Sequence, residues 1–285
     1  MVFNTNILAG SGGQAGDDAF SPLGLQIKNS AGSQTNYLQS VCSANASTSS
    51  PFSNRADNGK KATVTMWYYP LVKLANNSHI FTFQSGTNAL TSNTPYSFFF
   101  RTDDPTLSFQ VLWRNAADNA FSINQIKNTF ILNQWNCMLF SFNASATDKS
   151  IRWYHNDVDQ SAGLATNTLY NFGSGATNYG TSMSVASKVG QAPFAGAIAE
   201  LYYAPNQFID FDIEANRRLF LNADGTPVDL GEDGSTPTGS KPITYLSLRE
   251  GEGAEQFGVN RGIGADLSVV GNVSIFADAV SCSIA

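Results

Sequence analysis

The stretch from Phe194 to Leu248 reads FAGAIAELYYAPNQFIDFDIEANRRLFLNADGTPVDLGEDGSTPTGSKPITYLSL and decides the fold. Residues 195–203 are apolar at nearly every position, which is typical of a β-strand that is buried on both faces. A short helical segment follows, and then a loop rich in Gly, Pro and Asp that no regular element tolerates. Residues 243–248 read as a strand again. The stretch therefore predicts a helix and a long loop that leave a sheet and return to it.

The predicted helix covers residues 211–221. Asp210 or Asp212 suits the N-cap position, because a carboxylate accepts hydrogen bonds from the free N–H groups of a first helical turn. Ile213 and Phe220 lie on one stripe of this helix, and we expect both to pack against a sheet edge. A helix of this length is not stable alone in water, so tertiary packing must hold it in place.

The rest of the chain alternates between apolar and polar residues in short segments that are separated by polar turns, as expected for strands of a β-sandwich. Asn156 and Asp157 tolerate positive φ angles and predict a tight hairpin turn. The segments that predict strands are Leu25–Lys28, Asn36–Leu38, Ala62–Tyr69, Ile80–Gln84, Tyr96–Arg101, Leu107–Trp113, Trp135–Asn143, Ser150–His155, Ser184–Gly190 and Val273–Phe276.

These segments predict an all-β protein with a single sandwich domain over residues 23–285. We place a C-terminal extension of this domain after about residue 249, where the chain becomes rich in glycine. Residues 1–22 are rich in Gly, Ser and Asn and are expected to form an extended N-terminal arm. The length of 285 residues is sufficient for one such domain with its own core.

The composition excludes several classes of partner. Charged residues make up 13% of the chain, about half of the usual share, so amides and hydroxyls must supply the polar surface. The net charge is −6 and no basic block occurs, which argues against nucleic-acid binding. No secretory leader and no apolar run of about 20 residues is present. We therefore expect a protein that folds in a cytoplasm and does not insert into a membrane.

Several short motifs point to one family. They are Asn4–Gly10 (NTNILAG), Asn36–Leu38 (NYL), Thr63–Trp67 (TVTMW), Asn133–Asn136 (NQWN), Tyr154–Asp157 (YHND) and the stretch Phe194–Leu248. In this order they resemble the laminin-G-like (concanavalin A-like) jelly-roll domains of tailed-bacteriophage virion proteins. Only the last third of the chain carries a specific likeness; the rest is compatible with any laminin-G-like sandwich.

This resemblance implies a non-enzymatic virion protein, such as a capsid decoration, a head fibre or a tail-associated surface protein. It implies assembly with other capsid or tail proteins and a homo-oligomer, for which a trimer is the first expectation. It also implies localisation in the virion and a role in attachment to the host surface. A carbohydrate-binding, lectin-like receptor module is the alternative. Its site would lie in the rim loops at residues 87–94, 115–119 or 170–181.

Few residues suit acid–base catalysis. His79 and His155 are the only histidines, and neither accompanies a pattern typical of a Ser or Cys nucleophile. We interpret His155 as a surface or turn histidine beside the predicted hairpin. Glycosidases need two carboxyl groups on either side of the scissile bond, but the acidic residues of this chain fall in loops. We therefore expect no catalytic residue and no enzymatic activity.

The remaining candidate sites concern calcium and the cysteines. Asp103 and Asp104 follow a predicted strand and supply the oxygen ligands that Ca²⁺ prefers, although two aspartates before a proline also initiate a turn. Calcium is the only cofactor that we consider. Cys42, Cys137 and Cys282 form no CxxC pattern and are odd in number, so we expect reduced, partly buried thiols.

Overall fold

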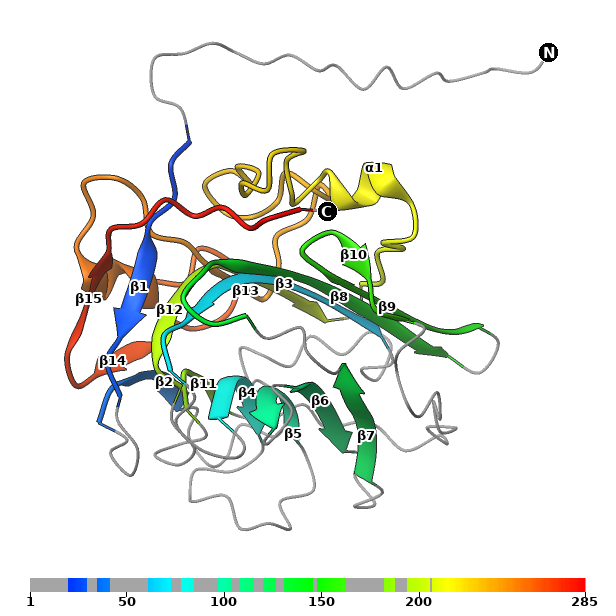
Figure 1. Cartoon of the computed structure of the whole chain (residues 1–285), viewed down its shortest axis with the longest axis horizontal. Helices are drawn as coiled ribbons and strands as arrows, with labels where there is room; N and C mark the ends of the chain where they lie inside the picture. The colour runs from blue at the N-terminus through cyan, green and yellow to red at the C-terminus, as the bar shows by residue number, and fades with distance from the viewer. Residues whose placement is uncertain are drawn as a thin grey trace.

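The protein is a two-layer antiparallel β-sandwich, which confirms the predicted fold class. The computed structural model describes residues 20–29, 35–41, 61–72, 78–84, 97–103, 108–114, 120–126, 131–145, 148–161, 182–187, 194–205 and 207–284. Figure 1 shows a larger curved sheet lying over a smaller one, with the short helix, the loop beside it and the C-terminal segment forming a third layer above the larger sheet. None of the helices in the described part of the chain has the length and apolar character that crossing a bilayer requires.

The larger sheet has eight strands in the order β10-β9-β8-β3-β12-β1-β15, and β13 pairs with β12 beside this path. Its strands are β1 (Gly24–Ile27), β3 (Lys61–Pro70), β8 (Asn136–Ser145), β9 (Asp148–His155), β10 (Val158–Asp159), β12 (Gly196–Pro205), β13 (Thr244–Leu246) and β15 (Val273–Phe276). Asn156 and Asp157 have φ angles of 49° and 63° and join β9 to β10, which confirms the predicted tight turn.

The smaller sheet has seven strands in the order β14-β2-β11-β4-β5-β6-β7. They are β2 (Tyr37–Val41), β4 (Ser78–Gln84), β5 (Ser97–Asp103), β6 (Ser108–Arg114), β7 (Ala120–Ile126), β11 (Ser182–Val185) and β14 (Ser268–Val270). The sequence analysis missed β7 and β14, the two edge strands of this sheet, and the short 3₁₀ helix η2 (Ala254–Gly258). Edge strands bury less side-chain surface, so their apolar alternation is weaker.

Two apolar clusters hold the three layers together. The first fills the space between the two sheets and contains Val64, Met66, Phe140 and Ile198. The second lies on the outer face of the larger sheet, beneath the chain that follows β12, and contains Trp67, Trp135 and Tyr202. Trp67 and Trp135 are both almost fully buried.

Strand β12 is buried along its whole length on both faces, as its apolar composition predicted. A β-bulge interrupts it: Ala199 pairs with Trp67 and Tyr202 with Thr65, so two residues of β12 face Met66 alone. Glu200 is one of these two and has a φ angle of +48°. A left-handed conformation is uncommon for a residue other than glycine.

The predicted helix is shorter than expected and is held differently. α1 (Glu214–Arg217) begins after Ile213, which takes the N-cap position without any side-chain cap, so the prediction of Asp210 or Asp212 as N-cap is wrong. Both aspartates instead form ion pairs with Arg152 on β9, at 2.7 Å each. Their carboxylates are therefore bound to the neighbouring strand and do not cap the first turn of α1.

The β9–β10 turn anchors the other end of α1. Asp157 accepts bonds from Arg217 at 2.6 Å and from Arg218 at 2.7 Å, and the Arg217 guanidinium lies 4.5 Å from the centre of the Tyr154 ring. Phe220 is buried against Tyr202 of the central strand β12, so it packs on the face of the sheet and not on the predicted edge. Ile213 is 53% exposed, so its predicted contact with a sheet edge is wrong. The ion pairs from Asp157 to Arg217 and Arg218 hold α1 against the sheet, and Ile213 does not.

The contrast between Phe220 and Ile213 gives a stability prediction. Phe220→Ala removes a buried ring and should lower the free energy of unfolding by about 3–5 kcal/mol. Ile213→Ala, seven residues earlier, should change it by less than about 0.5 kcal/mol, because the side chain is largely in solvent. Denaturant unfolding of both variants measures this. Equal destabilisation by the two substitutions would contradict the packing described above.

Candidate functional site

The residues predicted to bind calcium are only partly described. Asp103 is the last residue of β5 and pairs with Ser108 on β6, whereas Asp104 lies outside the described residues. Within the described ranges, no group of three or more His, Cys, Asp or Glu side chains is arranged to hold a metal ion. Calcium binding by Asp103 and Asp104 stays a prediction. The rim loops at 87–94, 115–119 and 170–181 also lie outside the described residues.

The histidines and cysteines that the structure describes are buried. His155 is 6% exposed, and its ring nitrogen Nε2 lies 3.0 Å from the Tyr68 hydroxyl, so its interpretation as a surface histidine is wrong. Burial lowers the pKa of His155 to about 4. Cys137 and Cys282 are free, buried thiols, as predicted, and Cys42 lies outside the described residues. None of these groups reaches a pocket wall.

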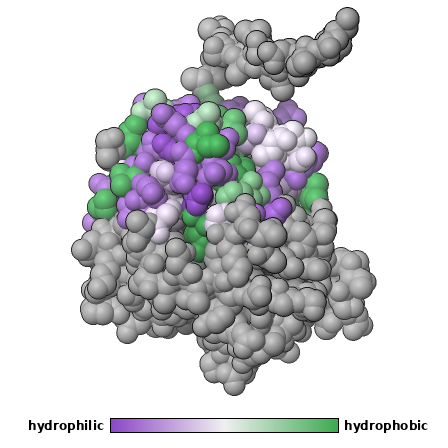
Figure 2. Space-filling model, turned by 90° about the vertical axis from the view of Figure 1, so that its right-hand side faces the viewer, coloured by the Kyte–Doolittle hydropathy of each residue, from purple (hydrophilic) through white to green (hydrophobic). Residues whose placement is uncertain are grey.

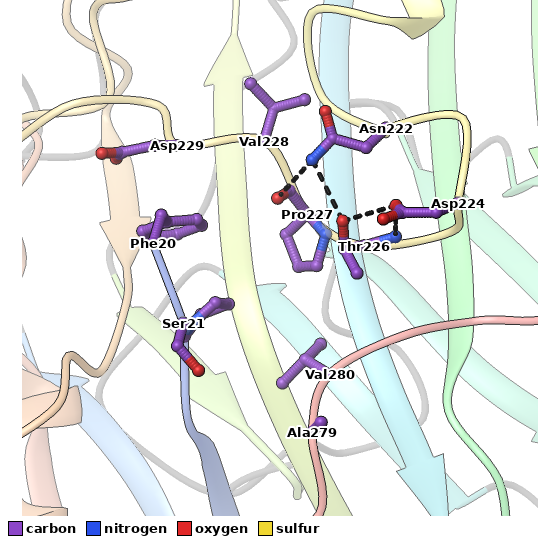
Figure 3. Close-up of a pocket in the computed structure, with 11 residues that line it drawn as sticks. Phe20, Ser21, Asn222, Asp224, Thr226, Pro227, Val228, Asp229, Ala279 and Val280 are labelled. Carbon is purple, nitrogen blue, oxygen red and sulfur yellow. Dashed lines mark hydrogen bonds between the residues drawn. The ribbon is translucent and has the colours of Figure 1, made fainter. Parts of the chain in front are cut away.

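A pocket of about 440 Å³ opens in the layer that covers the larger sheet. Three segments that are distant in the sequence form its walls: residues 20–22, which lead into β1, residues 222–229 after α1, and residues 279–280 of the C-terminal segment. Figure 3 shows Phe20 and Ser21 on one side, with Pro227, Thr226 and Val280 facing them across the opening.

A tight turn forms the polar wall of the pocket. The Asp224 carboxylate oxygen Oδ1 accepts bonds from the backbone N–H of Thr226 at 3.0 Å and from its hydroxyl at 2.6 Å. The Asn222 side-chain amide donates to the Thr226 hydroxyl at 3.1 Å and to the Pro227 carbonyl at 3.1 Å, as Figure 3 shows. These bonds fix the turn before any ligand arrives.

The turn also rests on the C-terminal segment. Gly225 has a φ angle of +86°, and its carbonyl accepts a bond from the Cys282 N–H at 3.0 Å. A Cβ atom at this position would lie 2.0 Å from the Cys282 carbonyl oxygen. Glycine is therefore required both by the backbone conformation and by the close approach of the two segments.

Arg249 supports the opposite wall. Its guanidinium lies 4.6 Å from the centre of the Phe20 ring, pairs with Asp229 at 3.1 Å and donates to the Gly231 carbonyl at 3.0 Å. One cation thus fixes an aromatic ring and a carboxylate that both line the pocket.

A buried acid lies behind Arg249. Glu200, at the bulge of β12, accepts bonds from the Tyr245 hydroxyl at 2.7 Å and from the Ser247 hydroxyl at 2.5 Å. Arg249 reaches the same Tyr245 oxygen at 3.4 Å. Burial raises the pKa of Glu200 to about 7, even though both hydroxyl bonds favour the charged form. The carboxyl group is 1% exposed and does not line the pocket.

The sequence analysis did not find this pocket. Its walls come from three separated segments, and no local motif links them. The sequence around Asp224-Gly225-Thr226-Pro227 is a turn signal, and it is the one local feature that could have directed attention to this wall. The surface in Figure 2 is mainly hydrophilic where residues are described, and its apolar residues form small separate spots, which is normal for a protein surface.

The chain matches no protein-family model and no curated protein. Among solved structures it is similar to the CBM40 module of the Ruminococcus gnavus IT-sialidase, with 12% identity, a TM-score of 0.42, and coverage of 66% of this chain and 94% of that one. It is also similar to tailspike protein 2 of the Escherichia coli O157:H7 bacteriophage CAB120, with 13% identity, a TM-score of 0.40, and coverage of 82% and 31%.

A third similar structure is the leech intramolecular trans-sialidase, with 12% identity, a TM-score of 0.39, and coverage of 67% of this chain and 27% of that one. The chain therefore spans less than a third of the tailspike protein and of the leech enzyme.

Glu200 gives a prediction on pH dependence. Its pKa in the folded state is raised, so the stability that its protonated form provides is full below pH about 4.5 and is lost as the pH rises through about 7. From this group alone, the free energy of unfolding should fall by about 3 kcal/mol between pH 4.5 and pH 8. Glu200→Gln should remove this fall and retain bonds to Tyr245 and Ser247.

Denaturant unfolding of both proteins across this pH range measures the difference. His155 has a lowered pKa and causes a loss of stability as the pH falls from about 6.5 to about 4, but this contribution is common to both proteins and cancels in the comparison. Glu255→Gln, at an exposed carboxylate on η2, is the control and should retain the wild-type pH dependence. An identical pH dependence of Glu200→Gln and wild type would overturn the assignment.

Proposed function

We propose that this protein is a non-catalytic surface module of a bacteriophage virion that binds a saccharide in the pocket between residues 20–22, 222–229 and 279–280. The lining of the pocket is the observation that supports saccharide binding. Phe20 offers a partly exposed aromatic ring beside Pro227 and Val280, while Asp224 and Asn222 present hydrogen-bonding groups at the rim. A sugar ring has an apolar C–H face and a rim of hydroxyls, so it needs both kinds of surface at once.

The size and rigidity of the pocket fit this role. Its volume of about 440 Å³ lies within the range of small-molecule sites. The turn at 222–226 is fixed by its own hydrogen bonds and by the C-terminal segment, and Phe20 is held by Arg249. Binding therefore orders few groups, which favours affinity from a small contact area.

The acids at the site support the absence of catalysis. A glycosidase needs a carboxylic acid with a raised pKa beside the scissile bond and a second carboxylate across from it. At the pocket, the Thr226 hydroxyl lowers the pKa of Asp224, and Asp229 is paired with Arg249. Glu200 has the raised pKa that a general acid requires, but it is sealed beneath Tyr245 and Arg249.

The virion as location rests on the residue motifs, from Asn4–Gly10 to Phe194–Leu248, that resemble phage virion proteins. The low share of charged residues, 13%, is compatible with an assembled protein whose surface is partly covered by neighbours. In this proposal the chain forms a homo-oligomer, a trimer first, attaches to other capsid or tail proteins, and presents the pocket to a glycan of the host surface.

Blocking the pocket should abolish binding. The purified protein, titrated calorimetrically with a panel of neutral, amino and acidic methyl hexosides and 3'-sialyllactose, should bind at least one of them saturably and without turnover. Ala279→Leu places a larger side chain at an exposed position of the wall and should weaken that binding by about tenfold or more. Glu255→Gln, outside the pocket, should bind as wild type does.

Two results would contradict the proposal. Saturable binding that Ala279→Leu leaves unchanged would place the sugar site elsewhere on the protein. Release of reducing ends from a polysaccharide panel would show that the protein is an enzyme. Sedimentation analysis of the same samples tests the oligomeric state, and a monomer with no affinity for any virion component would count against the virion assignment.

A further inference from the structure

We infer that the pocket selects a neutral or amine-bearing sugar and rejects acidic sugars such as uronic and sialic acids. The inference rests on the proposed function and adds the chemical class of the ligand. It follows from the balance of charges and of hydrogen-bond donors and acceptors in the walls.

Asp224 is the uncompensated charge of the pocket. Its oxygen Oδ1 accepts both bonds from Thr226, while Oδ2 bonds to none of the residues that the structure describes. Those bonds also keep the carboxylate in its charged form at neutral pH, because they lower its pKa. An exposed acceptor with a full negative charge therefore stands at the rim and is available to a ligand that donates hydrogen bonds.

Asp229, by contrast, has a cation beside it. Its oxygen Oδ1 accepts the Gly231 N–H at 2.9 Å and the Arg249 guanidinium at 3.1 Å. Both partners belong to the wall itself, so this carboxylate helps to shape the pocket and its charge is balanced by a neighbouring cation.

No cation remains for an acidic ligand. Lys and Arg are absent from the residues that line the described pocket, and Arg249, the cation that contacts Phe20 and Asp229, is committed to several groups of the wall. It pairs with Asp229, donates to the Gly231 carbonyl, stacks on Phe20 and reaches the Tyr245 oxygen that binds Glu200. Bidentate recognition of a carboxylate needs a guanidinium with two free N–H groups in one plane, which this arrangement does not offer.

The polar groups of the pocket walls thus favour a ligand that donates hydrogen bonds. The Asn222 amide N–H groups are used within the turn, on Thr226 and Pro227, and the Asp224 Oδ2 acceptor remains. Sugar hydroxyls donate to such an acceptor, and an ammonium group also adds a favourable charge. A carboxylate on the sugar offers no donor and brings a like charge near Asp224, which weakens binding by about fivefold at contact distance in water.

The test uses methyl hexosides matched in ring configuration. For glucose, galactose and mannose, the hexoside, the 2-amino-2-deoxyhexoside and the hexuronic acid glycoside are titrated into wild-type protein, Asp224→Asn and Glu255→Gln at low and at physiological salt. In the preferred series, wild type should bind the neutral and amino sugars at least about fivefold more tightly than the uronic acid. Added salt should narrow the gap between the amino and the acidic sugar.

Asp224→Asn keeps the shape of the turn and removes its charge, so the preference for the neutral sugar over the uronic acid should fall about fivefold and the advantage of the amino sugar should disappear. Glu255→Gln should leave both preferences unchanged. Tighter binding of the uronic acid or of 3'-sialyllactose would overturn this inference and leave the proposed function standing. Absence of binding by every sugar at the pocket would overturn the proposed function and this inference with it.

Discussion

The burial of β12 on both faces is the constraint on which the rest of the structure depends. All ten residues of this strand are buried, with Ile198 and Leu201 facing the smaller sheet and Ala199 and Tyr202 facing outward. A two-layer sandwich covers only one face of each sheet, so a further piece of chain must cover the outer face of β12. The segment after β12 and the C-terminal segment supply that cover (Figure 1).

The covering layer also explains the pocket. It is built from turns and loops, whose backbone groups cannot be satisfied by sheet pairing and must find partners within the layer or in water. The bonds among Asn222, Asp224 and Thr226, and the bond between Gly225 and Cys282, meet this need. Irregular segments held in this way do not pack as closely as strands, and the space between them and residues 20–22 is the pocket.

Much of the sandwich could be predicted from the sequence, because alternation and two-sided apolar runs report burial directly. The strand at 195–203 was recognised in this way, and the Asn156-Asp157 turn from the tolerance of both residues for positive φ angles. The exposure of Ile213 could not be predicted, because α1 is held by ion pairs and not by this side chain. These pairs join Asp157 to Arg217 and Arg218, about 60 positions away in the sequence. The pocket could not be predicted either, because its walls meet only through the topology of the sheets.

The bulge at Glu200 connects the core to this outer layer. The extra residue turns a carboxyl group toward Tyr245 of β13 and toward Ser247, which follows this strand, and both bind it. A left-handed backbone conformation and a buried carboxyl group both raise the free energy of the folded state. The hydrogen bonds around Glu200 must therefore hold it in this position. The same Tyr245 oxygen meets Arg249, which fixes Phe20 and Asp229 at the pocket. The acid with the raised pKa is thus enclosed beneath the wall, whereas Asp224 meets solvent and is held in its charged form by Thr226. The group with the raised pKa is therefore separated from the pocket by the residues that support its wall.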